Sequence, residues 1–316
     1  MLSVTAMFSA TRASALGSLV SVALLTGCAG SDSGKTDVDA TPPAASTPGA
    51  NDGGGSALGD FGQSDATAPP PENVVKEVFG HSASTLYKLD PKTKAVTEVG
   101  PFEGCGAVID IAIDEASNLY ADASNALYTV DKTTAVCTKI SGGSGLPDSL
   151  SFVPKGTLDP NEEALVGYTN SDYVRIDVKT GVKTVIGPLE AGGLISSGDV
   201  VSVKGGPTFL TAKVKIVCTN PECKKCSSGD CLLEVDPKTG KMLKNWGSVG
   251  HNDVFGLSFW GGKLYGFDNA GNLFEVAFGP TEITVTDIPI PSKPKDLSFW
   301  GAASSTSAPL VAPGPS

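Results

Sequence analysis

The chain has 316 residues, with 23 Lys and Arg against 34 Asp and Glu, so its formal net charge is −11. Proteins that bind nucleic acid neutralise phosphates with Lys and Arg, and this charge argues against such a partner. No internal apolar run reaches the 18 residues of a membrane-spanning helix. A content of 40% apolar residues and 38 glycines favours a globular, β-rich protein.

The first 28 residues have the pattern of an export signal. Arg12 is the only charged residue before residues 13–25, which are small and apolar. This stretch is too short to span a bilayer and has the length of the apolar part of a secretory signal. It ends in Leu25-Thr26-Gly27-Cys28, which resembles the lipobox of bacterial lipoproteins.

In that family the cysteine becomes the lipid-modified first residue of the mature protein. The resemblance implies a signal peptide at residues 1–27 and lipidation at Cys28. Ala29, rather than Asp, follows the cysteine, which in such lipoproteins permits export to the outer membrane. Several acyl chains would anchor the protein firmly, since each buried methylene contributes about 0.8 kcal/mol. The alternative is an ordinary signal peptide with a chance cysteine.

We predict that residues 28–72 consist of the lipidated cysteine followed by a disordered tether. They are rich in Ser, Thr, Pro, Gly, Ala and Asp and contain almost no large apolar side chain. Such a segment cannot bury enough surface to offset the entropy lost on ordering. As a flexible coil it would reach about 35 Å, enough to hold a domain away from a membrane.

From about residue 74 the chain repeats. An apolar strand followed by a turn occurs five times, and the residue after the strand falls at positions 90, 131, 177, 236 and 277. The spacings are 41, 46, 59 and 41 residues, and the longest contains a Cys-rich insertion, residues 218–231. The turn reads Asp-Pro-Lys-Thr-Gly in its fullest form, where Asp caps the turn, Pro fixes φ and Gly tolerates positive φ.

A second set of short apolar strands keeps step with the first. Its five members are residues 110–113, 149–152, 200–203, 256–259 and 296–299. With intervening strands such as 118–122 and 263–267, each unit has four short antiparallel strands in 40 to 47 residues. This is the pattern of a β-propeller blade. The Leu-Tyr-x-Val-Asp and Asp-Pro-x-Thr-Gly phrases resemble bacterial propellers of the NHL and YVTN types.

The ends of the repeat predict how the ring closes. Residues 74–99 supply three strands of a blade, and residues 295–300 supply the missing first strand. One blade shared between the termini leaves no open edge. We therefore predict an all-β fold, a propeller of five four-stranded blades over residues 73–303, with six blades as the alternative. Residues 304–316 are expected to form a disordered tail.

Apart from Cys28, six cysteines remain, an even number that favours disulfides in an exported chain. Cys105 and Cys137 fall at the two ends of one blade and are expected to pair. The other four are Cys218, Cys223, Cys226 and Cys231. Their spacing predicts nested pairs, 218–231 and 223–226, with a tetrahedral zinc site as the alternative.

An acidic residue lies at or just before every predicted first strand. These residues are Asp110, Asp148, Asp199, Asp253 and Asp296. First strands line the central channel of a propeller, so a ring of carboxylates there could hold a hard cation such as calcium. The alternative, which we favour, is that Asp caps the turns before the strands and faces solvent.

Two tryptophans recur in one phrase, Leu-Ser-Phe-Trp-Gly, at Trp260 and Trp300. They are candidates for a partner-binding face, or large rings that fill the space between blades. His251 stands beside Asp253 and could act as a base, but no nucleophile motif accompanies it, and we expect a polar loop residue.

These patterns predict a lipid-anchored, exported protein whose propeller is a non-enzymatic binding scaffold for a protein or glycan partner. It would be a monomer in the periplasm or at the cell surface, without nucleic acid, cofactor or catalytic residues. The alternative is an extracellular carbohydrate-active enzyme that uses channel carboxylates as acid and base.

Overall fold

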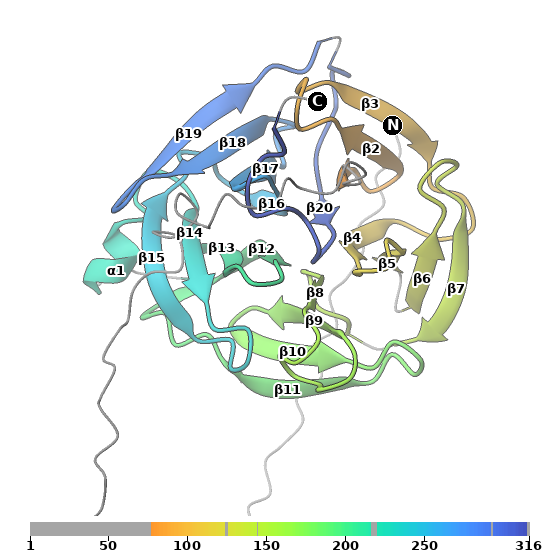
Figure 1. The fold of residues 1–316 in the computed structure, drawn as a ribbon, viewed down its shortest axis with the longest axis horizontal. Helices are drawn as coiled ribbons and strands as arrows, with labels where there is room; N and C mark the ends of the chain where they lie inside the picture. The colour runs from red at the N-terminus through yellow and green to blue at the C-terminus, as the bar shows by residue number, and fades with distance from the viewer. Residues whose placement is uncertain (1–76, 124–125, 144, 216–219, 292, 315–316) are drawn as a thin grey trace, which may run out of the picture. The chain divides into compact units, whose positions relative to one another are not determined.

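The repeated pattern forms five antiparallel sheets of four strands each, arranged around a common centre as the blades of a β-propeller (Figure 1). The computed structural model describes residues 77–123, 126–143, 145–215, 220–291 and 293–314, all within Gly53–Ser316. Five blades and an all-β fold are therefore confirmed, and no sixth blade occurs among the described residues.

The blades are numbered in chain order, and each is given from its innermost to its outermost strand. Blade 1 consists of β20 (Gly301–Ser304), β1 (Val78–His81), β2 (Thr85–Leu89) and β3 (Val96–Pro101). Blade 2 consists of β4 (Val108–Ile113), β5 (Leu119–Ala123), β6 (Ala126–Val130) and β7 (Cys137–Gly142). Blade 3 consists of β8 (Ser151–Val153), β9 (Ala164–Thr169), β10 (Asp172–Ile176) and β11 (Lys183–Pro188).

Blade 4 consists of β12 (Leu194–Ser202), β13 (Thr208–Val214), β14 (Cys231–Val235) and β15 (Met242–Ser248). Blade 5 consists of β16 (Val254–Trp260), β17 (Lys263–Asp268), β18 (Leu273–Phe278) and β19 (Ile283–Ile288). A short helix, α1 (Pro221–Lys224), lies in the connection from β13 to β14. The innermost strands contact one another around the common centre (Figure 1).

Blade 1 closes the ring with strands from both ends of the described chain. β20 pairs with β1 in antiparallel register, with Val78 opposite Ser304 and Phe79 opposite Ala303. The predicted sharing of one blade between the termini is confirmed.

The closing strand is not the predicted one, however. Residues 296–299 form a loop, and the strand begins at Gly301. Leu297 and Phe299 are buried from that loop, in the core between blades 1 and 5. A Cβ atom at position 301 would lie 2.0 Å from Asp110 Oδ1, so the innermost position of this blade requires a glycine. The prediction was wrong because residues 296–299 have the apolar composition of a strand, although they pack from a loop.

An Asp-centred turn joins the third and fourth strands of four blades, as the repeat predicts. The four aspartates are Asp90, Asp131, Asp177 and Asp236. In each turn an Asp Oδ1 accepts the N–H two residues later, at 2.8 or 2.9 Å. The fourth residue after each Asp has a left-handed φ between 59° and 75°, which explains the glycine of the motif at Gly181 and Gly240.

The tyrosines of blade 3 bond to the turn of blade 4. Tyr168 Oη donates to Gly240 O at 2.7 Å, and Tyr173 Oη donates to Pro237 O at 3.0 Å. Burial raises the pKa of both phenols. The two rings lie 4.9 Å apart in the core between the blades, so these bonds fix neighbouring blades without leaving a buried hydroxyl unsatisfied.

Where we expected a disordered tail, residues 305–314 (the C-terminal segment) contact each of the other four blades. Ser305 Oγ donates to Asp114 O in blade 2 at 2.9 Å, and Thr306 Oγ1 donates to the Glu163 carboxylate in blade 3. The N–H of Lys204 in blade 4 donates to Thr306 O, and that of Gly261 in blade 5 donates to Pro309 O, both at 2.8 Å. The segment therefore lies across one mouth of the channel.

Two disulfides join described residues. Cys105 pairs with Cys137 across blade 2, as predicted. Cys226 pairs with Cys231, and Cys223 is bonded to a partner outside the described residues. The nested pairs 218–231 and 223–226 are therefore wrong, and Cys223, Cys226 and Cys231 are disulfide-bonded rather than free thiolates. Helix α1 turns the chain so that Cys226 faces the start of β14, with a Cα–Cα distance of 5.1 Å to Cys231.

These disulfides are consistent with a protein of an oxidising, extracytoplasmic compartment. In the described part of the chain, no helix has the length and apolar character needed to cross a membrane.

Candidate functional site

The centre of the propeller is built around two aspartates that accept hydrogen bonds from four backbone N–H groups, one from each of blades 2 to 5. The four groups belong to Ile111, Leu150, Val200 and Leu257. Asp110 accepts from Ile111 and Leu150 at 2.8 and 2.6 Å. Asp199 accepts from Val200 and Leu257 at 2.6 and 2.5 Å. We call this arrangement the central hub, because Asp110 connects blade 2 to blade 3 and Asp199 connects blade 4 to blade 5.

Both hub carboxyl groups are fully buried. Burial raises the pKa of Asp110 well above its usual value, and the charges of Asp199 and Asp122 raise it further. Burial also raises the pKa of Asp199, although its hydrogen bonds oppose this. Each carboxyl group influences the pKa of the other, and both pKa values are raised by burial. Burial in the hub therefore disfavours the doubly charged state of this pair.

His81 lies beside the hub and is fully buried. Its Nδ1 donates to Ser82 O at 2.8 Å, and burial lowers its pKa to about 4, so the imidazole is neutral near pH 7. Its Nε2 lies 3.8 Å from Asp110 Oδ1 and has no hydrogen-bond partner in the described structure. The proximity of Gly301, where a Cβ would lie 2.4 Å from this Nε2, leaves no space for a ligand there.

The other three predicted channel acids lie away from the hub. Asp148, Asp253 and Asp296 are exposed on loops. Asp253 Oδ1 lies 3.6 Å from Lys213 Nζ. The five acids therefore do not converge. The structure separates them, since Asp110 and Asp199 lie inside β4 and β12, whereas the other three stand in loops.

A cavity of about 900 Å³ lies between blades 2 and 3. Its walls come from the β4–β5 turn, the β8–β9 loop and the β10–β11 turn. Tyr120 and Phe152 form a tilted aromatic pair in the wall, with ring centroids 4.9 Å apart. Burial, with Asp114 next to the phenol, raises the pKa of Tyr120 to about 12. Three loops that are far apart in the chain form this cavity, so no local sequence pattern indicates it.

Charged side chains line the same cavity. Arg175 Nη2 lies 3.5 Å from Asp159 Oδ2 and 3.8 Å from Glu162 Oε1. Glu163 is half-buried, and burial raises its pKa. Its carboxylate accepts the N–H of Glu115 at 2.6 Å and the hydroxyl of Thr306, so the C-terminal segment also supports this wall.

A second cavity, of about 380 Å³, lies on blade 5 around His251. The His251 ring stacks on Phe274, with centroids 4.1 Å apart. Its Nδ1 lies 2.9 Å from Asp268 Oδ2, and its Nε2 lies 3.1 Å from Asp287 Oδ1. His251 is thus a loop residue, as expected, but it is fixed by two carboxylates that the sequence did not place near it.

The two candidate tryptophans are not equivalent. Trp260 lies in β16 and is buried in the core between blades 1 and 5. Trp300 lies in the loop before β20 and is 37% exposed. The repeated phrase therefore supplies one core residue and one surface residue, and only Trp300 can contact a partner without rearrangement.

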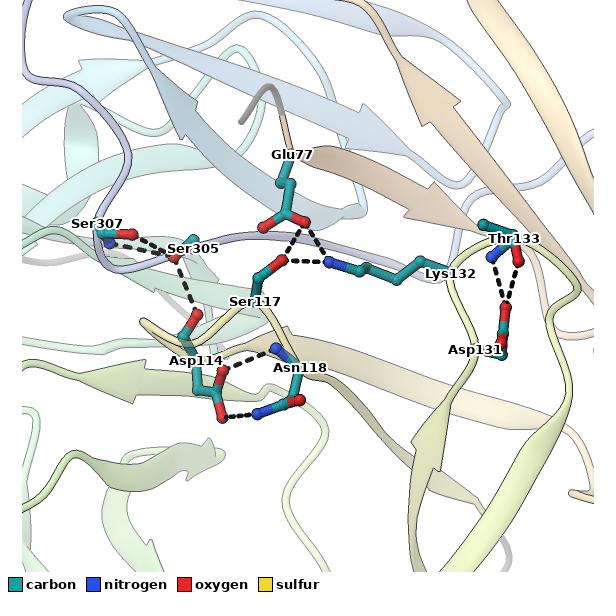
Figure 2. Close-up of polar contacts among 9 residues, drawn as sticks. All are labelled: Glu77, Asp114, Ser117, Asn118, Asp131, Lys132, Thr133, Ser305 and Ser307. Atoms are coloured by element: carbon teal, nitrogen blue, oxygen red, sulfur yellow. Dashed lines mark hydrogen bonds and ion pairs between the residues drawn. The ribbon is translucent and has the colours of Figure 1, made fainter. Parts of the chain in front are cut away.

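Figure 2 shows a polar cluster at the first described residue. The Glu77 carboxylate accepts from Ser117 Oγ and from Lys132 Nζ, which also contacts the Ser117 hydroxyl. Glu77 is buried, and Ser117 has a left-handed φ of 71°. Since Lys132 is ion-paired with Glu77, its ammonium does not serve as a base for Ser117. The cluster ties the start of β1 to two turns of blade 2.

Among the residues that the structure describes, no three His, Cys, Asp or Glu side chains are placed to hold a metal ion. Cys28, the predicted lipidation residue, lies outside the described residues, as does Cys218.

Comparisons with known proteins show similarity in fold only. No family model matches the chain, and no curated protein matches it. A protein of unknown function from Bacteroides caccae aligns with a TM-score of 0.36 and 11% identity, covering 70% of this chain and 76% of that chain. A chain from a nidogen–laminin complex aligns with a TM-score of 0.40 and 10% identity, covering 72% of this chain and 96% of that chain.

A third solved structure comes from work on the de novo evolutionary emergence of a symmetrical protein. It aligns with a TM-score of 0.46 and 14% identity, covering 72% of this chain and 98% of that chain. The five four-stranded sheets and their closure through β20 define the class, a five-bladed β-propeller.

Proposed function

We propose that this protein is an exported lipoprotein, anchored to the outer membrane through Cys28, whose propeller is a non-enzymatic binding scaffold for a protein or glycan partner. Two features support export: the lipobox-like residues 25–28, and disulfides of a kind that form in oxidising compartments. The tether predicted over residues 28–72 would hold the propeller away from the membrane.

The observation that supports binding is the cavity between blades 2 and 3. Its volume of about 900 Å³ lies within the range of ligand sites, about 300–1,000 Å³. It combines the Tyr120–Phe152 pair with charged groups on loops, and loops on a fixed scaffold commonly carry binding residues. The hub supports the scaffold, because its hydrogen bonds connect blade 2 to blade 3 and blade 4 to blade 5.

The alternative function, a carbohydrate-active enzyme with channel carboxylates, has no observation in its favour. Such enzymes place two carboxyl groups on either side of a sugar, about 5–9.5 Å apart. Asp110 and Asp199 are instead fully buried and accept from backbone N–H groups, and Asp296 lies on an exposed loop.

The anchor is tested by Cys28→Ser. The variant should accumulate as an uncleaved or mislocalised precursor, because the lipid attachment atom is missing. Membrane fractionation and the mass of the mature N-terminus measure this. A variant that matures and fractionates like the wild type would overturn the lipoprotein assignment.

Binding is tested by site-specific photo-crosslinking in intact cells. A photoreactive side chain replaces Glu162, on the rim of the cavity, or Leu243, an exposed residue on the outer strand of blade 4. We expect a discrete adduct from position 162 and none from position 243. The same adducts from both positions, or none from either, would contradict a partner at this cavity.

A further inference from the structure

The cavity around His251 is lined mainly by polar side chains. It is formed by the loop before β16 and the turn between β17 and β18. Its side chains are three asparagines, two aspartates and one histidine, in addition to glycine and alanine: Gly250, His251, Asn252, Asp253, Asp268, Asn269, Ala270 and Asn272. A volume of about 380 Å³ is at the small end of the range for ligand pockets, about 300–1,000 Å³.

The charges at this cavity are already paired. Asp268 accepts from Asn272 N and Nδ2 at 2.8 and 2.9 Å and contacts His251. Asp287 contacts the other nitrogen of His251, and Asp253 lies beside Lys213. Lys293 Nζ donates to Ala270 O at 2.8 Å. Since each ionic group faces a partner, the cavity favours a neutral ligand over an anion or a cation.

Two amide groups at the cavity remain available. The Asn252 side chain makes no hydrogen bond to any described residue, and it is exposed. Asn269 accepts from Ser298 Oγ, which leaves its NH₂ group without a partner in the described structure. A carboxamide offers both donors and an acceptor, which matches adjacent hydroxyl groups that each donate and accept.

The loop that carries His251 and Asn252 is supported from behind by the Cys-rich insertion. Asp230 N donates to His251 O at 2.7 Å, and Val249 N donates to Asp230 O at 2.8 Å. Asp230 Oδ2 also accepts from Val254 N at 2.8 Å. The Cys226–Cys231 disulfide closes the chain around Asp230, so the geometry of the cavity wall depends on this disulfide.

From the paired charges, the free carboxamides and the volume, we infer that this cavity is a binding subsite for one residue of a neutral carbohydrate. The assignment rests on the proposed binding function and narrows its partner class. In this arrangement Asn252 and Asn269 bond to adjacent sugar hydroxyls, and His251 and Asp268 set the shape of the wall.

The test measures binding of the purified full chain to an array of neutral oligosaccharides. Asn252→Ala removes an amide that has no protein partner, so the variant should melt like the wild type. The matched control is Asn161→Ala, which changes an asparagine lining the cavity between blades 2 and 3. We expect Asn252→Ala to weaken glycan binding about tenfold, and the control to bind as the wild type does.

The outcomes separate the two proposals. Wild-type binding that Asn252→Ala leaves unchanged, or that Asn161→Ala removes, overturns the subsite while the scaffold function stands. No binding to any neutral glycan, with a discrete adduct from position 162, likewise overturns the subsite alone. No glycan binding and no adduct overturns both. Reduction of the disulfides should weaken binding in the wild type, because it releases the support behind the loop.

Discussion

At the scale of single residues, Asp122 should govern how stability depends on pH. Its Oδ1 accepts the N–H of Asp110 at 2.7 Å, and burial raises its pKa to about 8. A raised pKa means that the folded state holds a proton that the unfolded chain has released, so the stability from this group falls as pH rises towards 8. Burial lowers the pKa of His81 to about 4, and its effect is confined to pH below about 6.5.

We therefore predict that the unfolding free energy falls between pH 6.5 and 8, by up to about 1.4 kcal/mol per pH unit for each such proton. Asp122→Asn keeps the acceptor oxygen and removes the titration, so its curve should be flatter over this window. Urea unfolding at half-unit pH steps measures both chains. Parallel curves for the variant and the wild type would show that Asp122 is ionised when buried.

Gly301 is the second residue for which the structure predicts the effect of a substitution on stability. A Cβ there would lie 2.0 Å from Asp110 Oδ1 and 2.4 Å from His81 Nε2. Gly301→Ala should cost about 1–3 kcal/mol of unfolding free energy, because the hub must shift to accept the methyl group. The control is Gly142→Ala, a strand position with nothing within 4 Å of the added Cβ. Equal melting temperatures for the two variants would mean that the hub yields easily.

At the scale of elements, the Asp-centred turn shows two separate reasons for a glycine: the backbone has a positive φ, and a neighbouring atom leaves no space for a Cβ atom. Lys94 and Ala135 hold the same turn position as Gly181, with φ near 60°, so a side chain is tolerated where there is room. At Gly181 a Cβ would lie 1.8 Å from Gly142 O. The glycine is required there by its neighbour in blade 2 as well as by the turn.

We predict that Gly181→Ala destabilises the propeller by more than Gly156→Ala. Both positions have positive φ, but nothing lies within 4 Å of a Cβ at Gly156. Left-handed backbone alone should cost about 1–2 kcal/mol at Gly156, and the clash should add to this at Gly181. Chemical denaturation of both variants measures the difference. If the two costs are the same, the neighbouring blade adapts without penalty.

The elements also show where sequence reasoning fails. Blade number and turn chemistry follow from local signals, such as the Asp that caps each turn and the spacing of the strands. The position of the closing strand does not follow from local signals. Leu297 and Phe299 belong to an apolar, strand-like stretch, but they pack into the core from a loop. The pairing of Cys226 with Cys231 depends on a four-residue helix that no periodicity reveals. The larger cavity was missed for a related reason, since it joins three loops that are distant in sequence.

At the scale of the whole molecule, the last described residues have two roles. β20 closes the ring, and the C-terminal segment connects the other four blades. A chain ending at Ser304 retains every strand of the five blades but loses the contacts of the C-terminal segment. Four hydrogen bonds of about 0.5–1.5 kcal/mol each imply a loss of about 2–6 kcal/mol. A chain ending at Pro294 also lacks β20 and should fail to melt cooperatively.

Differential scanning calorimetry of both truncated chains tests this. The longer one should fold with a lowered melting temperature, whereas sequence composition alone predicts that it melts like the full chain. Full stability after removal of residues 305–316 would show that the segment adds nothing to the propeller. A cooperative transition in the chain ending at Pro294 would refute closure through β20.

The Glu77 cluster would have a mechanical consequence under the proposed anchor at Cys28. Tension reaching residue 77 would act where its carboxylate bonds to Ser117 and Lys132. Beyond it, β1 is hydrogen-bonded along both edges, to β20 and to β2. A force along β1 would have to shear both ladders together, whereas an edge strand would peel bond by bond. The described start of the propeller is thus built to resist a pull along the chain.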